Sequence, residues 1–358
     1  MAADSDVAAP DEQAVDAFTG RVLGDTAAAA TVFMAALGDR LGLFKQLAEH
    51  GPADSAALAD RAGCDERYVR EWLRGMTAAS YLTREPDGRF ALPAAHAPVL
   101  AVEPGPAFFG GVHQELLGAL QGYHELVDAF RQGGGIAPDQ LDEDVWVGTS
   151  RFTAQWHQNM LVQLWLPLLP EVRAKLEAGA RVADVGTGSG HALRTLAQHF
   201  PNGTYVGYDE NAGVIDRAER EAEATGLADS LRFEVRDAAA GLPEKFDVIT
   251  TFDMLHDAVD PLALLTSIRD ALEPDGVYVC LDINCADDPD QNSGPIATLL
   301  YGFSLLYCMT TSLARGGAGL GTLGLPEAKL RELAAEAGFS EVRRVEMENP
   351  FNNLYVLR

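Results

Sequence analysis

A hydrophobic strand that runs into a glycine-rich turn constrains the fold of this chain more than any other feature. Residues 182–190 read Val-Ala-Asp-Val-Gly-Thr-Gly-Ser-Gly. The β-branched residues Val182 and Val185 favour a buried strand. The glycines that follow at every second position allow the backbone to turn sharply and to approach a bound molecule closely. A helix predicted from His191 to His199 then directs its N-terminus towards that molecule.

A second strand, predicted at residues 204–208, ends in Asp209, which lies 19 residues after Gly190. A carboxylate about 20 residues after a glycine turn binds ribose in open α/β sheets. The turn has no Lys-Ser or Lys-Thr pair, so the sequence does not predict the triphosphate site of a P-loop. Together these features predict a nucleoside cofactor.

Two further strands follow the same pattern. Residues 231–237 form a predicted strand that ends in Asp237, and residues 246–253 form one that ends in Phe252 and Asp253. Open α/β sheets bind ligands at the carboxyl ends of their strands. The acids and the glycine turn are therefore expected at one edge of a single sheet.

This order of motifs resembles the class I S-adenosylmethionine-dependent methyltransferases, and the resemblance covers about residues 175–358. It implies an α/β fold with a Rossmann-like, seven-stranded sheet closed by a final pair of strands. It also implies S-adenosyl-L-methionine as the cofactor: the glycine turn holds the methionine part, Asp209 takes the ribose hydroxyls, and Asp237 with Ala238 contacts the adenine. The candidate cofactor-binding residues are Asp184, Gly186, Thr187, Gly188, Asp209, Glu210, Asp237, Ala238, Phe252 and Asp253.

The N-terminal third has a different pattern. Residues 1–12 are small and acidic and are expected to be disordered. Residues 13–100 contain a succession of predicted elements: a helical pattern from Ala14 to Leu47, a short helix capped by Ser55, a helix from Glu66 to Ser80 capped by Asp65, and a hairpin marked by Asp87-Gly88. Helix, helix and hairpin in this order predict a winged helix.

Charge argues against DNA as the partner of this domain. The net charge of the chain is −26, and residues 54–93 hold seven acids against six arginines. A DNA-reading helix normally carries a positive excess, and a polyanion would be repelled at long range. No nucleic-acid partner is therefore expected. The domain resembles the winged helix of actinobacterial small-molecule methyltransferases, which implies a homodimer through the N-terminal domain.

The candidate substrate contacts lie outside the cofactor motifs. Residues 101–174 are interpreted as a helical connector and substrate cap, in which Trp156 and His157 combine an apolar helix face with polar groups. Residues 285–325 form a lid insertion, an apolar helix with Tyr301 and Tyr307 followed by a glycine tract. The alternative is that both segments only contribute to the core.

His256 is the candidate catalytic residue. It follows the fourth strand, beside the expected methyl donor, and histidine suits proton removal because its unperturbed pKa is about 6.5. The run Leu255-His256-Asp257 resembles the Leu-His-Asp-Trp motif of plant-type O-methyltransferases, which implies a general base. Ala258 stands where that motif has Trp, which leaves a pocket-lining role for His256 as the alternative.

The remaining features fit a cytoplasmic enzyme without a metal. The four cysteines are scattered, and the acids Asp253, Asp257 and Asp260 are interpreted as helix caps, so neither set predicts a metal site. The acidic N-terminus does not resemble a signal peptide. No apolar run is expected to be long enough to span a membrane.

The predicted function is SN2 methyl transfer from S-adenosylmethionine to a small, largely apolar or aromatic metabolite, in natural-product biosynthesis. Transfer to carbon or nitrogen without a general base is an alternative. Two others are a transcription regulator that senses S-adenosylmethionine through a degenerate enzyme domain, and a protein that uses the sulfonium in non-methyl chemistry. The charge balance and the intact cofactor motif argue against the regulator.

Overall fold

The computed structural model describes residues 11–358, which form two compact units. The helical unit comprises residues 11–103 and 108–113, and the sheet unit comprises residues 104–107 and 114–358. Residues 1–10 of the tail that the sequence predicts to be disordered lie outside the described residues. The last residue of this tail, Glu12, instead begins a helix, and the Asp11 carboxylate caps the first turn by accepting a hydrogen bond from Gln13 N at 3.0 Å.

The helical unit has the predicted order of helices and hairpin. Its elements are α1 (Glu12–Arg40), α2 (Leu43–His50), α3 (Ser55–Ala62), α4 (Glu66–Ala78), β1 (Thr83–Arg84), β2 (Phe90–Ala91) and α5 (Ala97–Leu100). The long helical pattern is broken at Gly42, whose φ of +68° favours glycine. Asp65 caps α4 as predicted, but α3 is capped by Asp54 and Ser55 is its first residue.

An apolar core joins these helices. The rings of Phe44 and Trp72 meet edge to face with centroids 5.0 Å apart. The indole N–H of Trp72 donates to the carbonyl of Met34 at 2.8 Å, so this buried polar group has a partner. The buried faces of α2, α3 and α4 thereby hold the C-terminal part of α1.

The sheet unit is built on one mixed sheet of seven strands in the order β5-β4-β3-β6-β7-β9-β8. Strands β3 to β7 are parallel, and β9 runs antiparallel to both β7 and β8. The strands are β3 (Arg181–Val185), β4 (Thr204–Asp209), β5 (Leu231–Val235), β6 (Phe246–Phe252), β7 (Leu272–Ile283), β8 (Val342–Val345) and β9 (Asn352–Leu357). The predicted α/β, Rossmann-like fold with a seven-stranded sheet is confirmed.

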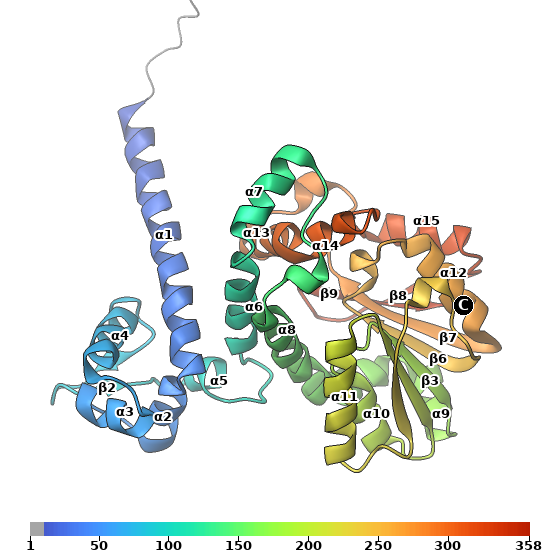
Figure 1. Cartoon of the computed structure of the whole chain (residues 1–358), viewed down its shortest axis with the longest axis horizontal. Helices are drawn as coiled ribbons and strands as arrows, with labels where there is room; N and C mark the ends of the chain where they lie inside the picture. The colour runs from blue at the N-terminus through green and yellow to red at the C-terminus, as the bar shows by residue number, and fades with distance from the viewer. Residues whose placement is uncertain (1–10) are drawn as a thin grey trace, which may run out of the picture. The chain divides into compact units, whose positions relative to one another are not determined.

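Helices cover both faces of this sheet (Figure 1). One hydrophobic core lies between the sheet and α9 (Pro170–Glu177), α10 (His191–His199) and α11 (Ala212–Ala224). The other lies between the sheet and α12 (Pro261–Ala271) with α15 (Glu327–Glu336). Because both faces are covered, the central strands are buried along most of their length, as β3 and β4 show.

Two helical segments supplement the sheet unit. The first contains α7 (Tyr123–Gln132), η1 (Pro138–Gln140), α8 (Glu143–Trp156), the π-helix η2 (His157–Trp165) and η3 (Leu166–Leu168). The second, between β7 and α15, contains η6 (Pro289–Gln291), α13 (Gly294–Phe303), the π-helix η7 (Ser304–Cys308) and α14 (Met309–Ala314). The helix α6 (Gly110–Leu120) precedes the first of these segments.

Two helical stretches are long and apolar enough, by length and composition alone, to cross a membrane: Glu12–Arg40 and Gly294–Ala314. The expectation that no apolar run reaches this length is therefore wrong. Core helices and signal sequences meet the same test, so it is weak evidence for a membrane span. In Gly294–Ala314, 44% of the tested window is buried, against 17% in α1.

Candidate functional site

The glycine turn leaves the carboxyl end of β3 and is fastened to β4. The N–H groups of Gly186 and Thr187 both donate to the carbonyl of Tyr208, at 2.8 and 3.0 Å. Gly186, Gly188 and Gly190 have φ values of +70°, +53° and +72°, which other residues rarely adopt. A Cβ at Gly190 would also lie 2.4 Å from the ring of Phe233. The turn therefore needs glycine for both conformation and space.

Asp209 connects the glycine turn to the loop that starts α11. One carboxylate oxygen accepts from Gly188 N at 3.0 Å and the other from Asn211 N at 2.9 Å. Burial raises the pKa of this carboxyl, although both backbone hydrogen bonds favour its charged form. Each oxygen keeps one lone pair with which it can accept a further hydrogen bond.

The other predicted cofactor residues occupy different depths around this turn. Asp184 is 2% exposed and accepts the Thr250 hydroxyl at 2.6 Å, and burial raises its pKa to about 7. Asp237 is exposed and accepts from Ala239 N at 2.9 Å, while Ala238 is buried at the start of η4 (Ala238–Ala240). Glu210 is exposed and forms an ion pair with Arg315, just after α14.

An aromatic group stands at the carboxyl end of β6. The ring of Phe252 lies 4.9 Å from that of His157 and stacks 6.2 Å from that of Trp165. His157 is 6% exposed, and neither of its ring nitrogens has a hydrogen-bond partner among the described residues. Burial lowers its pKa to about 3. Trp156, its neighbour, instead packs on Phe152 at 4.5 Å.

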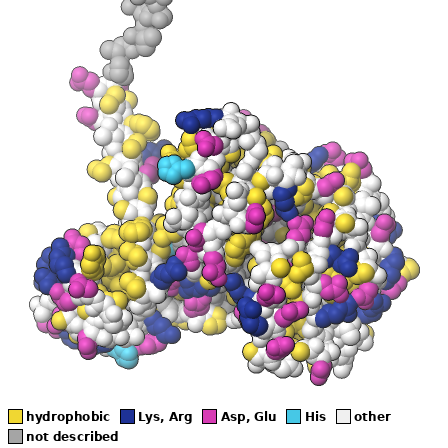
Figure 2. Space-filling model, in the orientation of Figure 1, with side chains coloured by type: hydrophobic (Ala, Val, Ile, Leu, Met, Phe, Trp, Pro, Cys, Tyr) yellow, Lys and Arg dark blue, Asp and Glu magenta, His cyan; other side chains and the backbone are white. Residues whose placement is uncertain are grey.

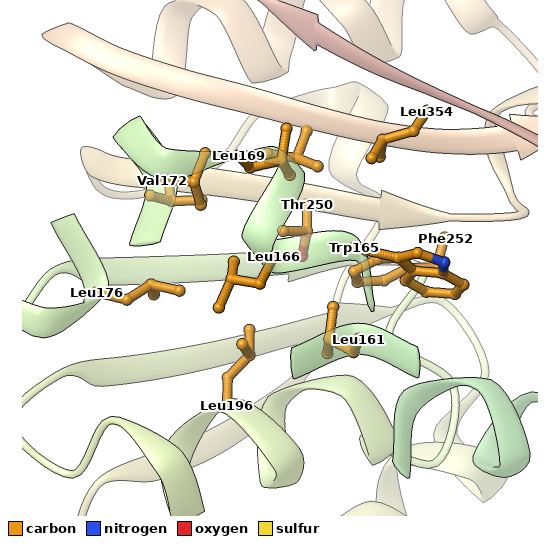
Figure 3. Close-up of a pocket in the computed structure, with 12 residues that line it drawn as sticks. Leu161, Trp165, Leu166, Leu169, Val172, Leu176, Leu196, Thr250, Phe252 and Leu354 are labelled. Carbon is orange, nitrogen blue, oxygen red and sulfur yellow. The ribbon is translucent and has the colours of Figure 1, made fainter. Parts of the chain in front are cut away.

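Phe252 also lines an apolar cavity between the sheet and the η2–α9 segment (Figure 3). Its walls are Leu161, Trp165, Leu166, Leu169, Val172, Leu176, Leu196, Val248, Thr250, Phe252, Val279 and Leu354. Most of these residues belong to the hydrophobic core on this face of the sheet. The cavity is therefore a gap in that core, and Phe252, Trp165 and Thr250 are the wall residues that it shares with the site.

The turn after β6 holds a second group of acids. Asp253 has a φ of +51°, unusual for a non-glycine residue, and its carboxylate accepts from Asn352 Nδ2 at 2.6 Å. Burial raises its pKa to about 7. Asp260 caps α12 by accepting from Ala263 N at 2.9 Å, as a helix cap should.

His256, in η5 (Leu255–Asp257), is 3% exposed and held between two carboxylates. Its Nδ1 lies 2.6 Å from Oδ1 of Asp282, and its Nε2 lies 3.2 Å from Oδ1 of Asp257. Asp282 is itself fixed, because it accepts from the backbone N–H of Leu255 at 3.1 Å. Burial alone would lower the pKa of His256, but these charges and hydrogen bonds hold that pKa well above 6.5.

The two predicted substrate tyrosines differ in position. Tyr307 is half-buried, and its ring meets that of Trp146 edge to face at 5.7 Å. Burial, followed by the nearby charge of Asp257, raises its pKa. Tyr301 is 43% exposed. The structure thus brings Tyr307 close to the acids after β6, whereas Tyr301 faces outward.

Sequence analysis missed two buried acids, Asp282 and Glu115. Asp282 lies at the carboxyl end of the apolar run that forms β7, and that position was the available signal. Glu115, on α6, is 8% exposed and hydrogen-bonds to Thr149. Burial, and then the charges of Asp257 and Asp253, raise its pKa to about 8. A single acid in an apolar helix gave no indication of this environment.

Comparison with known proteins agrees with this architecture. Residues 176–302 match the family described as a methyltransferase domain, and residues 28–102 match the Rv2258c-like winged HTH domain. A curated relative, the ubiquinone biosynthesis O-methyltransferase of Dinoroseobacter shibae, is 32% identical over 106 residues, which are 30% of this chain and 42% of the relative. The matched part is thus less than half of that relative.

Solved structures resemble nearly the whole chain. PigF, determined with SAH, has a TM-score of 0.71 at 20% identity and covers 98% of this chain and 100% of its own. NcsB1, an O-methyltransferase from neocarzinostatin biosynthesis, has a TM-score of 0.60 at 21% identity, and the match covers 92% of this chain and 95% of NcsB1. At such identities the likeness establishes the fold.

The sheet order and the glycine turn define a class I methyltransferase fold. The chain combines this methyltransferase domain with an N-terminal winged-helix domain, as the resemblance implied.

The raised pKa of Glu115 predicts a pH-dependent stability. The folded chain keeps a proton on Glu115 up to pH of about 8, whereas the unfolded chain releases it near 4.5. The stabilisation of the folded chain by protonated Glu115 is complete below pH 4.5 and is lost as pH rises through about 8. Between pH 6 and 9, the free energy of unfolding should therefore fall by about 2 kcal/mol more in wild type than in Glu115→Gln.

Urea unfolding at the two pH values measures this difference, with exposed Glu125→Gln on α7 as the matched control. Equal pH dependence in wild type and Glu115→Gln would contradict the buried, protonated state.

Proposed function

We propose that this protein transfers the methyl group of S-adenosyl-L-methionine to a small acceptor molecule. The observation that carries the proposal is the Asp209 carboxylate, which joins the glycine turn to β4 and keeps lone pairs for two ribose hydroxyls. A Cβ at Gly188 would meet nothing within 4 Å, so open space adjoins the turn. The residues present therefore fit the cofactor.

The roles of the remaining cofactor residues follow from their positions. Gly186, Thr187 and Gly188 would hold the methionine part, and Asp237 with Ala238 would contact the adenine. The cofactor supplies a methyl group on a positively charged sulfonium. The chain's residues align the acceptor with that methyl group and exclude water, which together remove much of the barrier to an in-line displacement.

His256 is the group proposed to accept the acceptor's proton, at Nε2. The Asp282 carboxylate, 2.6 Å from Nδ1, orients the imidazole and stabilises its charged form. The high pKa of His256 means that the imidazole holds a proton at neutral pH and must release it first. That property favours a second candidate, in which His256 only positions an acceptor carbon or amine that needs no base.

The acceptor is proposed to be a largely apolar or aromatic metabolite of natural-product biosynthesis. Support comes from the aromatic side chains Phe252, Trp165 and Tyr307 around the site. Among proteins of this fold, NcsB1 was crystallised with SAH and 1,4-dihydroxy-2-naphthoic acid. We place the reaction in the cytoplasm, where cysteines such as the four of this chain, all unpaired, remain reduced.

The N-terminal domain is proposed to join two copies of this chain. Of the 29 residues of α1, only Ala35, Ala36 and Gly38 are buried. Hydrophobic side chains cover much of the rest of this helix (Figure 2), among them the exposed Val15, Phe18, Val22, Leu23, Phe33 and Leu37. Such an exposed apolar helix is stabilised by pairing with a partner surface.

Replacing Asp209 tests the cofactor site. Asp209→Ala leaves the ribose hydroxyls and Gly188 N without an acceptor, which should weaken binding of S-adenosylhomocysteine by about 2 kcal/mol, or about 30-fold. Calorimetry measures the affinity, and Asp216→Ala, an exposed acid on α11, should bind like wild type. Unchanged affinity in Asp209→Ala would place the ribose elsewhere.

Replacing His256 separates the two chemical roles. If it accepts the proton, His256→Gln should bind cofactor normally but turn over about 10²- to 10⁴-fold more slowly. The wild-type rate should then rise with pH above neutrality, because the high pKa of His256 must be passed first. A loss of about tenfold with an unchanged pH profile indicates positioning alone. Full activity in the variant would refute both roles.

Light scattering tests the dimer. Wild type should have the mass of two chains at micromolar concentration, and Phe18→Asp with Leu23→Asp should have the mass of one, because two charges would be buried at the contact. Arg21→Ala, exposed on the same helix, should remain dimeric. A monomeric wild-type protein would exclude pairing through α1.

A further inference from the structure

Three side chains of different chemistry converge beside the sheet edge. One ligand atom each from His256, Asp257 and Cys308 can lie within 4.8 Å of the other two. His256 and Asp257 come from η5, and Cys308 comes from the end of η7, about 50 residues later in the chain. Imidazole nitrogen, carboxylate oxygen and thiolate sulfur are the three ligand types that Zn²⁺ accepts in proteins.

The surroundings of these atoms match those of a metal ligand set. The Nδ1 of His256 pairs with the Asp282 carboxylate at 2.6 Å, which leaves Nε2 directed at the cluster. Carboxylate pairing of this kind orients metal-binding histidines. The sulfur of Cys308 accepts a hydrogen bond from the Thr322 hydroxyl at 2.9 Å, which favours a thiolate. Burial, and then the charge of Asp257, raise the pKa of this thiol to about 12, so a metal ion would have to displace its proton.

Asp257 provides a further, independent indication. Its Oδ1 is buried and makes no hydrogen bond among the described residues, but it lies 3.2 Å from Nε2 of His256 and pairs with that ring when the ring is charged. A further ligand can use the lone pairs that this ion pair leaves on the carboxylate. A divalent ion would do so and would also neutralise the two anionic ligands.

We propose that His256, Asp257 and Cys308 form a site for a thiophilic divalent cation such as Zn²⁺, with the fourth coordination position open. Bonds of about 2.0–2.3 Å require ligand atoms roughly 3.3–3.8 Å apart, so the side chains must approach one another by up to about 1 Å. The ion would bind Nε2 of His256, the atom to which the proposed function assigns proton transfer. A bound ion would therefore inhibit methyl transfer, but the existence of the site does not depend on that activity.

Co²⁺ serves as the spectroscopic substitute for Zn²⁺. Titrating the full-length, reduced protein with Co²⁺ should give one equivalent of binding, with a thiolate-to-cobalt absorption band that Zn²⁺ removes. Cys308→Ser should lose the band, and Asp257→Asn should bind at least tenfold more weakly. Cys285→Ser, a buried cysteine outside the cluster, should behave like wild type.

Several results would overturn the proposal. They are the absence of the band in wild type, its persistence in Cys308→Ser, and its loss in Cys285→Ser. Circular dichroism shows whether each variant folds. If Cys308→Ser does not fold, the test rests on Asp257→Asn, and an unchanged affinity of the folded variant for Co²⁺ refutes the site. Because no methyl acceptor is present, this result is independent of the turnover of His256→Gln.

Discussion

The parallel pairing of β3 with β4 is the constraint on which the rest of the sheet unit depends. In this register Val185 lies opposite Tyr208, so β3 ends just where the Tyr208 carbonyl can receive two N–H groups of the glycine turn. β4 continues one residue further, and Asp209 closes the arrangement by accepting from Gly188. A change of register by one residue would separate these groups, so backbone pairing positions the polar atoms.

Burial also determines the charge states of the acids that follow β6. Three acids, Asp253, Asp257 and Asp282, lie around the imidazole of His256, and Glu115 lies near Asp253 and Asp257. Desolvation disfavours the charged carboxylates, and the carboxylates that remain ionised favour the imidazolium. Any cation that enters, whether a proton, a sulfonium or a metal ion, therefore meets surroundings that already favour positive charge.

The local elements of this fold were predictable from sequence because local residues specify them. The helix from His191 to His199 was predicted with the same bounds, since Gly190 in the left-handed conformation sets its start. Asp65 likewise marks the start of α4. The break at Gly42 was missed because one glycine interrupts an apolar pattern that continues on both sides.

Long-range pairings were not predictable in the same way. His256 and Asp282 are 26 residues apart, and Cys308 lies further still along the chain. Periodicity describes which face of an element is apolar, but it contains no information on which side chains meet across loops. The environment of Glu115 was hidden for the same reason, because it depends on α8 and on the turn after β6.

The insertion between β7 and α15 leaves the sheet and returns to it, carrying Tyr307 and Cys308 on a π-helical turn. The glycine turn, Asp209 and Asp237 all precede it in the chain. Residues of the insertion can thus be exchanged over evolutionary time while the strands that hold the nucleoside part stay unchanged. Differences in the choice of acceptor would then be recorded in this segment and in the segment around His157, and the sheet would record common descent.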